Sequence, residues 1–322
     1  MSERLVRKLH LLLIIIICLV SVHPVQSAAP VKAVRSDAGV LITQGEQKVL
    51  FYQIEPKSVG NRYICANYIH PLYGLDGSVL TEEFPADHLH HRGVFWAWHQ
   101  ILVGGKPVAD QWALEDFRWE FINTELINKS NGTAGLQVRV LWKSPEWQDS
   151  MGKPKPFVEE QTTVLVHPGT DRYRLIDVVL SLRALENNVQ IGGADDEKGY
   201  GGFSARIRLP DDIQFIGSTG SVTPKTTAVK AGPWLNITGS LGAGGQPAGL
   251  GILTHPTLPN YPAPWILRAS SSMQNAVFPG REPVALSLHE PLTLSYRMVV
   301  HDGSLTPEDL ESLQQQFAQE SS

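Results

Sequence analysis

The densest group of chemically active side chains lies between Thr81 and Gly93, in the run Thr-Glu-Glu-Phe-Pro-Ala-Asp-His-Leu-His-His-Arg-Gly. Histidine titrates near neutral pH and can take up or deliver a proton, and a neighbouring carboxylate can orient its ring. The run leads directly into residues 94–99, where two tryptophans would share one face of a strand. We therefore expect this stretch to carry the chemistry of the chain.

Three kinds of chemistry fit these histidines. As acid and base groups they would transfer protons at a bound substrate. As metal ligands, His88 and His90 would project from one face of an extended segment, and His99, Asp87 or the distant His255 would complete the shell. As structural groups they would bond loop carbonyls and hold a turn. Three histidines within four residues favour catalysis or substrate binding.

Two glycine-rich or polar loops could add further groups. Residues 195–202 are charged and could bring Lys198 and carboxylates to a pocket, although such runs are commonly solvated turns. Residues 255–268 combine His255 and Arg268 with stacking aromatic rings.

Two strands also carry charged residues. In the strand predicted at 292–300, Arg297 points away from the apolar row and should reach a polar cleft or solvent. The pair Glu159-Glu160 begins another strand and is predicted to be its solvated end.

This inventory of His, Arg, Lys, carboxylates and Trp suits a polyhydroxylated ligand, because sugars accept bidentate hydrogen bonds and stack on aromatic rings. The residues predicted to be catalytic are His88, His90, His91, Arg92, Lys198 and Arg297. The residues predicted to bind substrate are Glu82, Asp87, Trp96, Trp98, His99, His255, Arg268 and His301. No residue is assigned to a metal, and the sequence identifies no cofactor.

Short β-branched and aromatic runs, separated by turn residues, predict the elements that must position these groups. Examples are 40–43 with 49–52, 117–128 with 134–143, 158–166 with 172–185, and 205–209, 250–254, 284–288 and 292–300. They predict an all-β chain, with residues 28–303 forming a single large two-sheet antiparallel sandwich. Residues 304–322 should form a short C-terminal helix and tail, with Thr306 as N-cap and Pro307 in the first turn.

The N-terminal residues are typical of an export signal. Basic residues precede an apolar run from Leu11 to Val20, and small residues follow it, so 1–27 is predicted to be a signal peptide. The remaining chain should be periplasmic or extracellular, without a membrane-spanning segment. The net charge of the whole chain is −5, without a basic cluster, which argues against nucleic acid as a partner. Cys65 would be the only cysteine left, so no internal disulfide can form.

Three stretches resemble the secreted PmoA-like family of unknown function: the run 67–81, the block Asp87-His-Leu-His-His-Arg-Gly93, and the ending 294–303. The resemblance covers nearly the whole mature chain and implies membership, but no reaction. A membrane-bound methane oxygenase subunit needs several spanning helices, and this chain has none after its signal.

A looser similarity in length and strand pattern is to the galactose-mutarotase-like supersandwich, which implies the architecture and a sugar as substrate. We therefore predict a carbohydrate-active enzyme of the epimerase, lyase or glycoside hydrolase type, acting on a small-molecule or oligosaccharide substrate. A non-catalytic sugar-binding protein and a His-ligated metal enzyme or oxidoreductase are the alternatives.

Overall fold

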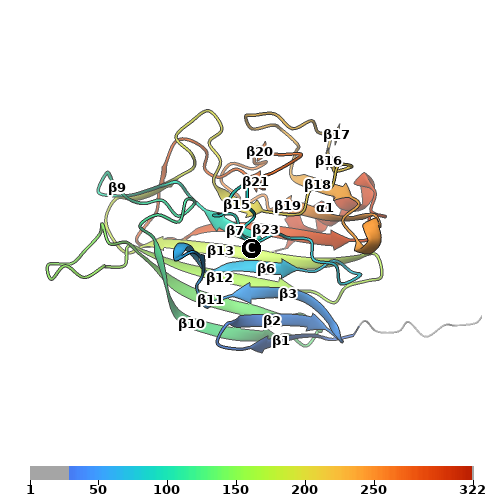
Figure 1. Cartoon of the computed structure of the whole chain (residues 1–322), viewed down its shortest axis with the longest axis horizontal. Coiled ribbons are helices and arrows are strands. Elements are labelled where there is room, and N and C mark those ends of the chain that lie inside the picture. Colours follow the sequence, from blue (N-terminus) through green and yellow to red (C-terminus); the bar gives the residue numbers. More distant parts are fainter. Residues whose placement is uncertain (1–28, 321–322) are drawn as a thin grey trace, which may run out of the picture.

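The computed structural model describes residues 29–320, which strands dominate (Figure 1). The predicted signal peptide lies outside the described residues. Within them, none of the helices has the length and apolar character needed to cross a membrane.

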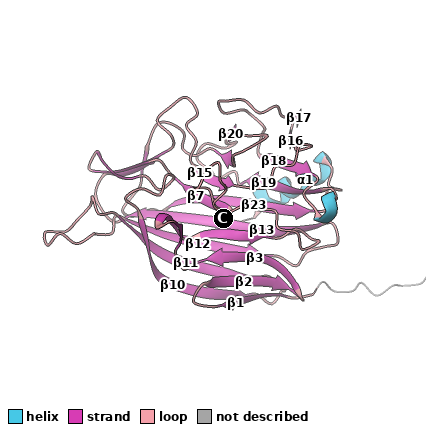
Figure 2. Ribbon diagram, in the orientation of Figure 1, coloured by secondary structure: helices cyan, strands magenta, loops and turns pink. Residues whose placement is uncertain are grey.

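Two large antiparallel sheets form the sandwich, and Figure 2 shows their strands as two layers with the helix at one end. In the described chain, the first sheet has eight strands, in the order β1 (Val31–Arg35), β2 (Gly39–Gln44), β3 (Gln47–Gln53), β6 (Tyr68–Leu72), β7 (Val94–Ala97), β15 (Gly202–Ala205), β21 (Gln274–Ala276) and β20 (Trp265–Ile266). The second has nine over the same residues, in the order β10 (Arg118–Asn128), β11 (Ala134–Lys143), β12 (Val158–Val166), β13 (Tyr173–Ala184), β23 (Leu292–His301), β19 (Ala248–Thr254), β18 (Trp234–Gly239), β16 (Gln214–Gly217) and β17 (Gly220–Ser221).

Smaller elements complete residues 29–320. They are a sheet of β22 (Val284–Ala285), β14 (Val189–Gly192), β8 (Gln100–Val103) and β9 (Lys106–Ala109), a hairpin of β4 (Lys57–Val59) and β5 (Arg62–Cys65), a 3₁₀ turn (Ala243–Gly245) and the helix α1 (Pro307–Gln319). The predicted fold class is confirmed. The strand expected at 205–209 is wrong except for Ala205, because β15 spans Gly202–Ala205 and Ile207 forms only an isolated bridge to Thr81.

Side-chain alternation explains how the sandwich closes. Every second residue of β12 is buried, from Val158 through Glu160 to Val166, so one face of the strand packs into the core. The main core cluster combines such residues from both large sheets. Cys65 is buried and free.

Strand β7 is buried on both faces. Trp96 and the following Trp98 enter the core between the sheets. Phe95 and Ala97 point the other way, into a second cluster that contains Trp112. The alternation of residues 94–98 was therefore predicted correctly, and the second cluster provides the floor on which the candidate site is built.

Helix α1 covers one end of the nine-stranded sheet. Thr306 is its N-cap and forms a capping box with Asp309, which satisfies backbone groups at the first turn. Leu310, Leu313 and Phe317 pack on side chains of β18, β19 and β23. The predicted helix start is confirmed.

Candidate functional site

The histidine block forms a compact turn. The amide of His88 donates to the carbonyl of Pro85, and the amide of His91 donates to that of His88. Gly93 closes the turn with φ 52°, where a Cβ would lie 2.0 Å from the carbonyl oxygen of Ile69, so no larger residue fits there. The extended segment that the metal-ligand alternative required is not formed, because these local hydrogen bonds fold the chain back on itself.

The turn gathers three imidazole rings. His88 and His91 are stacked, with ring centroids 4.6 Å apart and an interplanar angle of 3°. His90 stands edge-on to His91 at 4.6 Å. Across residues 29–320, however, no three His, Cys, Asp or Glu side chains are arranged to hold a metal ion.

Asp87 orients His88. Its Oδ2 lies 2.7 Å from Nδ1 of His88, and Arg206 donates from both Nη atoms to its two oxygens at 2.8 Å. Nε of Arg206 also donates to Glu82 at 2.7 Å. Burial alone would raise the pKa of Asp87, but the hydrogen bonds from Arg206 and His88 outweigh it and hold the pKa below its usual range. The ionised carboxylate accepts the Nδ1 proton, so Nε2 of His88 is left as a basic nitrogen.

The other two histidines are neutral at pH 7. Burial, and next the charge of Arg92, lower the pKa of His90 to about 4. Burial and the neighbouring imidazoles depress the pKa of His91 further. Nδ1 of His91 is buried without a hydrogen-bond partner among the described residues.

The rings open onto a cleft of about 250 Å³. Segments far apart in the sequence contribute its lining, which consists of His88, His90, His91, Trp112, Lys198, Tyr200, Arg268, Ser271, Ser272 and Met273. Five of the predicted site residues therefore meet here: the three histidines, Lys198 and Arg268. A larger cleft of about 380 Å³ lies beside α1, where Trp234, Pro307 and Glu311 are among the residues that line it.

A second histidine–carboxylate pair lies behind this lining. Nδ1 of His99 is 2.8 Å from Oδ2 of Asp110, and the ring stacks on Trp112 and meets Tyr200 edge-on. Nε2 of His99 is buried and has no partner within residues 29–320. His99 therefore adjoins the cleft through two rings that line it.

Arg92 was predicted to be catalytic, but it does not line the cleft. The residue is 1% exposed, and its guanidinium donates to the carbonyl of His90 and lies over the rings of Phe95 and Trp119. Arg92 therefore supports the histidine turn from the side of the second core cluster, to which Phe95 belongs. Glu82 and Asp87, predicted to bind substrate, hold Arg206 instead.

Trp96 and Trp98 are not ligand platforms. Both are buried in the main core, where the indole of Trp96 donates to Glu160 and that of Trp98 donates to the carbonyl of Phe278. The opposite face of β7 lies under the cleft, and the ring of Trp112 takes the place that the sequence suggested for them.

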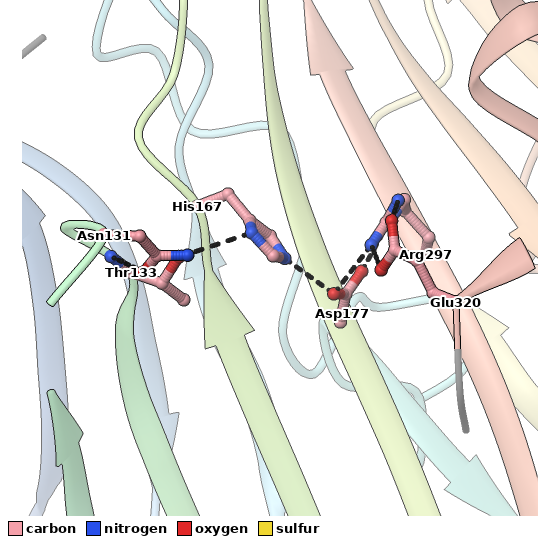
Figure 3. Close-up of polar contacts among 6 residues, drawn as sticks. All are labelled: Asn131, Thr133, His167, Asp177, Arg297 and Glu320. Carbon is pink, nitrogen blue, oxygen red and sulfur yellow. Dashed lines mark hydrogen bonds and ion pairs between the residues drawn. The ribbon is translucent and has the colours of Figure 1, made fainter. Parts of the chain in front are cut away.

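Arg297 was predicted to reach a cleft or solvent, and it does neither (Figure 3). Its side chain binds Asp177 through Nε at 2.5 Å and Nη2 at 2.9 Å, and Glu320 at 2.9 and 2.7 Å. His167 contacts the same Asp177 at 2.6 Å, and the ring of Phe317 covers the guanidinium. Burial would lower the pKa of Arg297, but its two carboxylate partners raise it. Arg297 is a buried cross-link between the sheet and the end of α1.

His255 and His301 also lie away from the cleft. His255 contacts Thr257 and the carbonyl of Glu320, and its ring packs edge-on against Phe317. His301 is 1% exposed and contacts Asn236. The predicted roles of His255, Arg297 and His301 in the site are therefore wrong, because these side chains serve the docking of α1 and the packing of the nine-stranded sheet.

Several residues of the site were missed from the sequence. Arg206, Asp110, Tyr200 and Trp112 belong to no motif, and only Tyr200 stands beside a predicted residue, two positions after Lys198. Arg206, a charged residue between Ala205 and Ile207, was the one local signal that could have pointed to a buried ion pair.

These observations define an all-β sandwich protein with a histidine–carboxylate pair at a small polar cleft. Residues 39–315 match the family described as "Family of unknown function (DUF6807)", and the chain belongs to that family. This match does not support the resemblance to the PmoA-like family. None of the curated proteins matches the sequence.

Two solved structures are remotely similar to the chain. A protein assigned as a kojibiose phosphorylase from the human microbiome is 6% identical, with 90% of this chain and 33% of that chain covered and a TM-score of 0.35. A protein assigned as a mutarotase (YeaD) from Salmonella typhimurium is 10% identical, with 84% and 94% covered and a TM-score of 0.32. The chain thus spans a third of the first protein. At these TM-scores neither similarity supports an argument about chemistry.

Proposed function

We propose that this chain is an exported enzyme that transfers a proton at a carbohydrate, with His88 as the base. The observation that carries the proposal is the chain of contacts from Arg206 through Asp87 to His88, whose ring lines the cleft. A carboxylate bound to Nδ1 fixes the tautomer with a free Nε2, which is the form that a general base needs.

The other side of the cleft supplies complementary groups. Burial, and next the charges of Asp196 and Asp110, raise the pKa of Tyr200, so its phenol stays protonated and can donate a proton. Lys198 and Arg268 can stabilise negative charge that develops on a substrate oxygen. A base, an acid and two cations around one cleft suit ring opening, elimination or glycosidic cleavage.

The alternatives are less well supported. A sugar-binding protein would rely on aromatic rings, of which Trp112 and Tyr200 line the cleft, but it would need no carboxylate-oriented histidine such as His88. A His-ligated metal enzyme would need a ligand group that the described residues do not form.

A product screen against neutral and acidic sugars and their oligosaccharides tests the proposal. We expect turnover of at least one substrate, and His88→Asn should lower kcat by about 10²-fold or more, because general base catalysis contributes on that order. His289→Asn is the matched control, since His289 is exposed and does not line the cleft. Binding without any product, or full activity of His88→Asn, would refute the proposal.

A further inference from the structure

The charged side chains that line the cleft are cations. Among the described residues, Lys198 and Arg268 line it together with three histidines, and no Asp or Glu does. The nearby carboxylates have partners of their own: Asp87 has Arg206 and His88, Asp110 has His99, and Asp196 has Lys198. A ligand in the cleft therefore meets cations among the lining residues and no carboxylate.

Arg268 is held rigidly from two sides. The side chain of Gln274 accepts from its backbone amide at 2.9 Å and donates to its carbonyl at 2.8 Å. Its Nη1 donates to the carbonyls of Lys225 and Leu267 at 2.8 Å, and its Nη2 donates to that of Thr226 at 2.9 Å. A guanidinium has five N–H groups, so Nε–H and one Nη2–H remain without a partner among the described residues.

The unused donors of Arg268 are those that bind a carboxylate elsewhere in this chain. Arg297 uses Nε and Nη2 to bind the two oxygens of Asp177. Arg206 likewise binds carboxylates through Nε and both Nη atoms. Arg268 has carbonyl partners only, and burial lowers its pKa, so its charge is partly desolvated without a compensating anion.

Lys198 adds a second positive charge. Its Nζ lies 3.3 Å from Asp196, and its side chain is 36% exposed. Such a pair is weak in water and can rearrange to share its cation with a ligand. Ser271 and Ser272 add neutral hydroxyl groups to the same lining.

We propose that the cleft binds a sugar acid, with the sugar's carboxylate bound by Nε and Nη2 of Arg268 and its charge further balanced by Lys198. This inference rests on the proposed function for the identity of the ligand as a sugar, and it adds the substrate class. A bidentate Arg–carboxylate pair gives geometric specificity as well as charge. The cavity of 250 Å³ is below the range of about 300–1,000 Å³ that is usual for ligand pockets, which favours a single ring or the end of a chain.

Calorimetric titration with matched pairs of sugars tests the inference. The probes are glucuronate against glucose and galacturonate against galactose, at pH 7 and low salt. We expect at least one uronate to bind about tenfold or more tightly than its neutral partner, and Arg268→Gln to abolish that preference. Lys198→Gln, in an exposed loop, should weaken uronate binding severalfold and provides a second test if Arg268→Gln does not fold. Arg35→Gln should keep the preference, since Arg35 also donates to a backbone carbonyl but lies on β1.

Equal affinity within both pairs, no uronate binding at millimolar concentration, or a preference that survives in Arg268→Gln would overturn the inference. Its failure is distinguishable from that of the proposed function. Turnover of a neutral sugar that depends on His88 would leave the proposed function standing and remove the sugar acid. Uronate binding that depends on Arg268, without conversion to any product, would support the sugar-acid inference and refute the proposed function.

Discussion

Asp87 and Arg206 determine how the ring of His88 is presented to the cleft. Arg206 holds the carboxylate from one side, and the carboxylate holds Nδ1 of His88 from the other. Both are positioning residues, because neither lines the cleft. Their contribution to a reaction would lie in the tautomer and orientation of His88.

Asp87→Asn should therefore impair the reaction while leaving the cleft in place. The amide can offer an N–H to Nδ1 and stabilise the wrong tautomer, so we expect kcat to fall by about 10²- to 10⁴-fold with a smaller change in KM. Asp87→Glu should recover part of the activity and the same pH profile of kcat. A loss of activity that only follows a loss of thermal stability, without recovery in Asp87→Glu, would indicate a structural role alone.

At the scale of elements, buried polar side chains connect the layers. Glu160 on β12 accepts hydrogen bonds from Trp142 and Thr162 of its own sheet. It also accepts from Trp96 on β7 of the other large sheet and from Asn67, which directly precedes β6 of that sheet. Arg297 on β23 joins Asp177 on β13 to the end of α1. Polar groups this deeply buried are costly when they lose a partner, so each of them specifies how the elements meet.

Arg297→Gln should destabilise the fold rather than the site. Removing the cation leaves Asp177 buried beside His167, and we expect the free energy of unfolding in urea to fall by about 3 kcal/mol. Ligand binding in the cleft should remain at temperatures where the variant is folded. Arg183→Gln is the control, since its pair with Glu159 in the same sheet is partly exposed and should be worth less than about 1 kcal/mol. Loss of ligand binding in folded Arg297→Gln would contradict this assignment.

At the scale of the whole molecule, buried neutral histidines link stability to pH. Burial lowers the pKa of His301 to about 4, and its Nδ1 accepts from the amide of Gly303. Because the unfolded chain takes up this proton near pH 6.5 and the folded chain does not, the stabilisation is complete above pH 6.5 and is lost as the pH falls towards 4. Asp87 and Asp177, with lowered pKa values, act below this window.

We expect the wild-type protein to lose stability between pH 7 and pH 5, with His301 contributing up to about 2 kcal/mol of that loss. Urea unfolding at both pH values measures it. His301→Gln should reduce the difference between the two pH values, whereas His289→Gln should not. Glu160 acts in the opposite direction, because burial raises its pKa, so the comparison with His301→Gln isolates the histidine. An identical pH dependence in His301→Gln would refute the assignment.

Local sequence patterns determined the elements of this protein. Alternating apolar residues between turn residues predicted the strands, and Thr306-Pro307 predicted the start of α1, because both signals depend on neighbours within a few positions. Alternation along β12 also places Glu160 on the same face as Val158 and Val164. The burial of Glu160 could therefore have been predicted, although the residue was predicted to be solvated. The concentration of histidines in one short stretch likewise predicted one side of the cleft, because it depends only on residues close together in the sequence.

Only the tertiary structure decided which distant residues meet. Arg206 pairs with Asp87, and Lys198 and Arg268 face the histidines, because loops from separate strands converge on the outer face of β7. Alternation separated Arg297 from its apolar neighbours, yet it could not show that Asp177 and α1 cover that face. The sequence pattern of a charged residue opposite an apolar row is the same whether that residue meets solvent, a cleft or a buried partner. The pairing of distant strands and the docking of the helix determine which of these it meets.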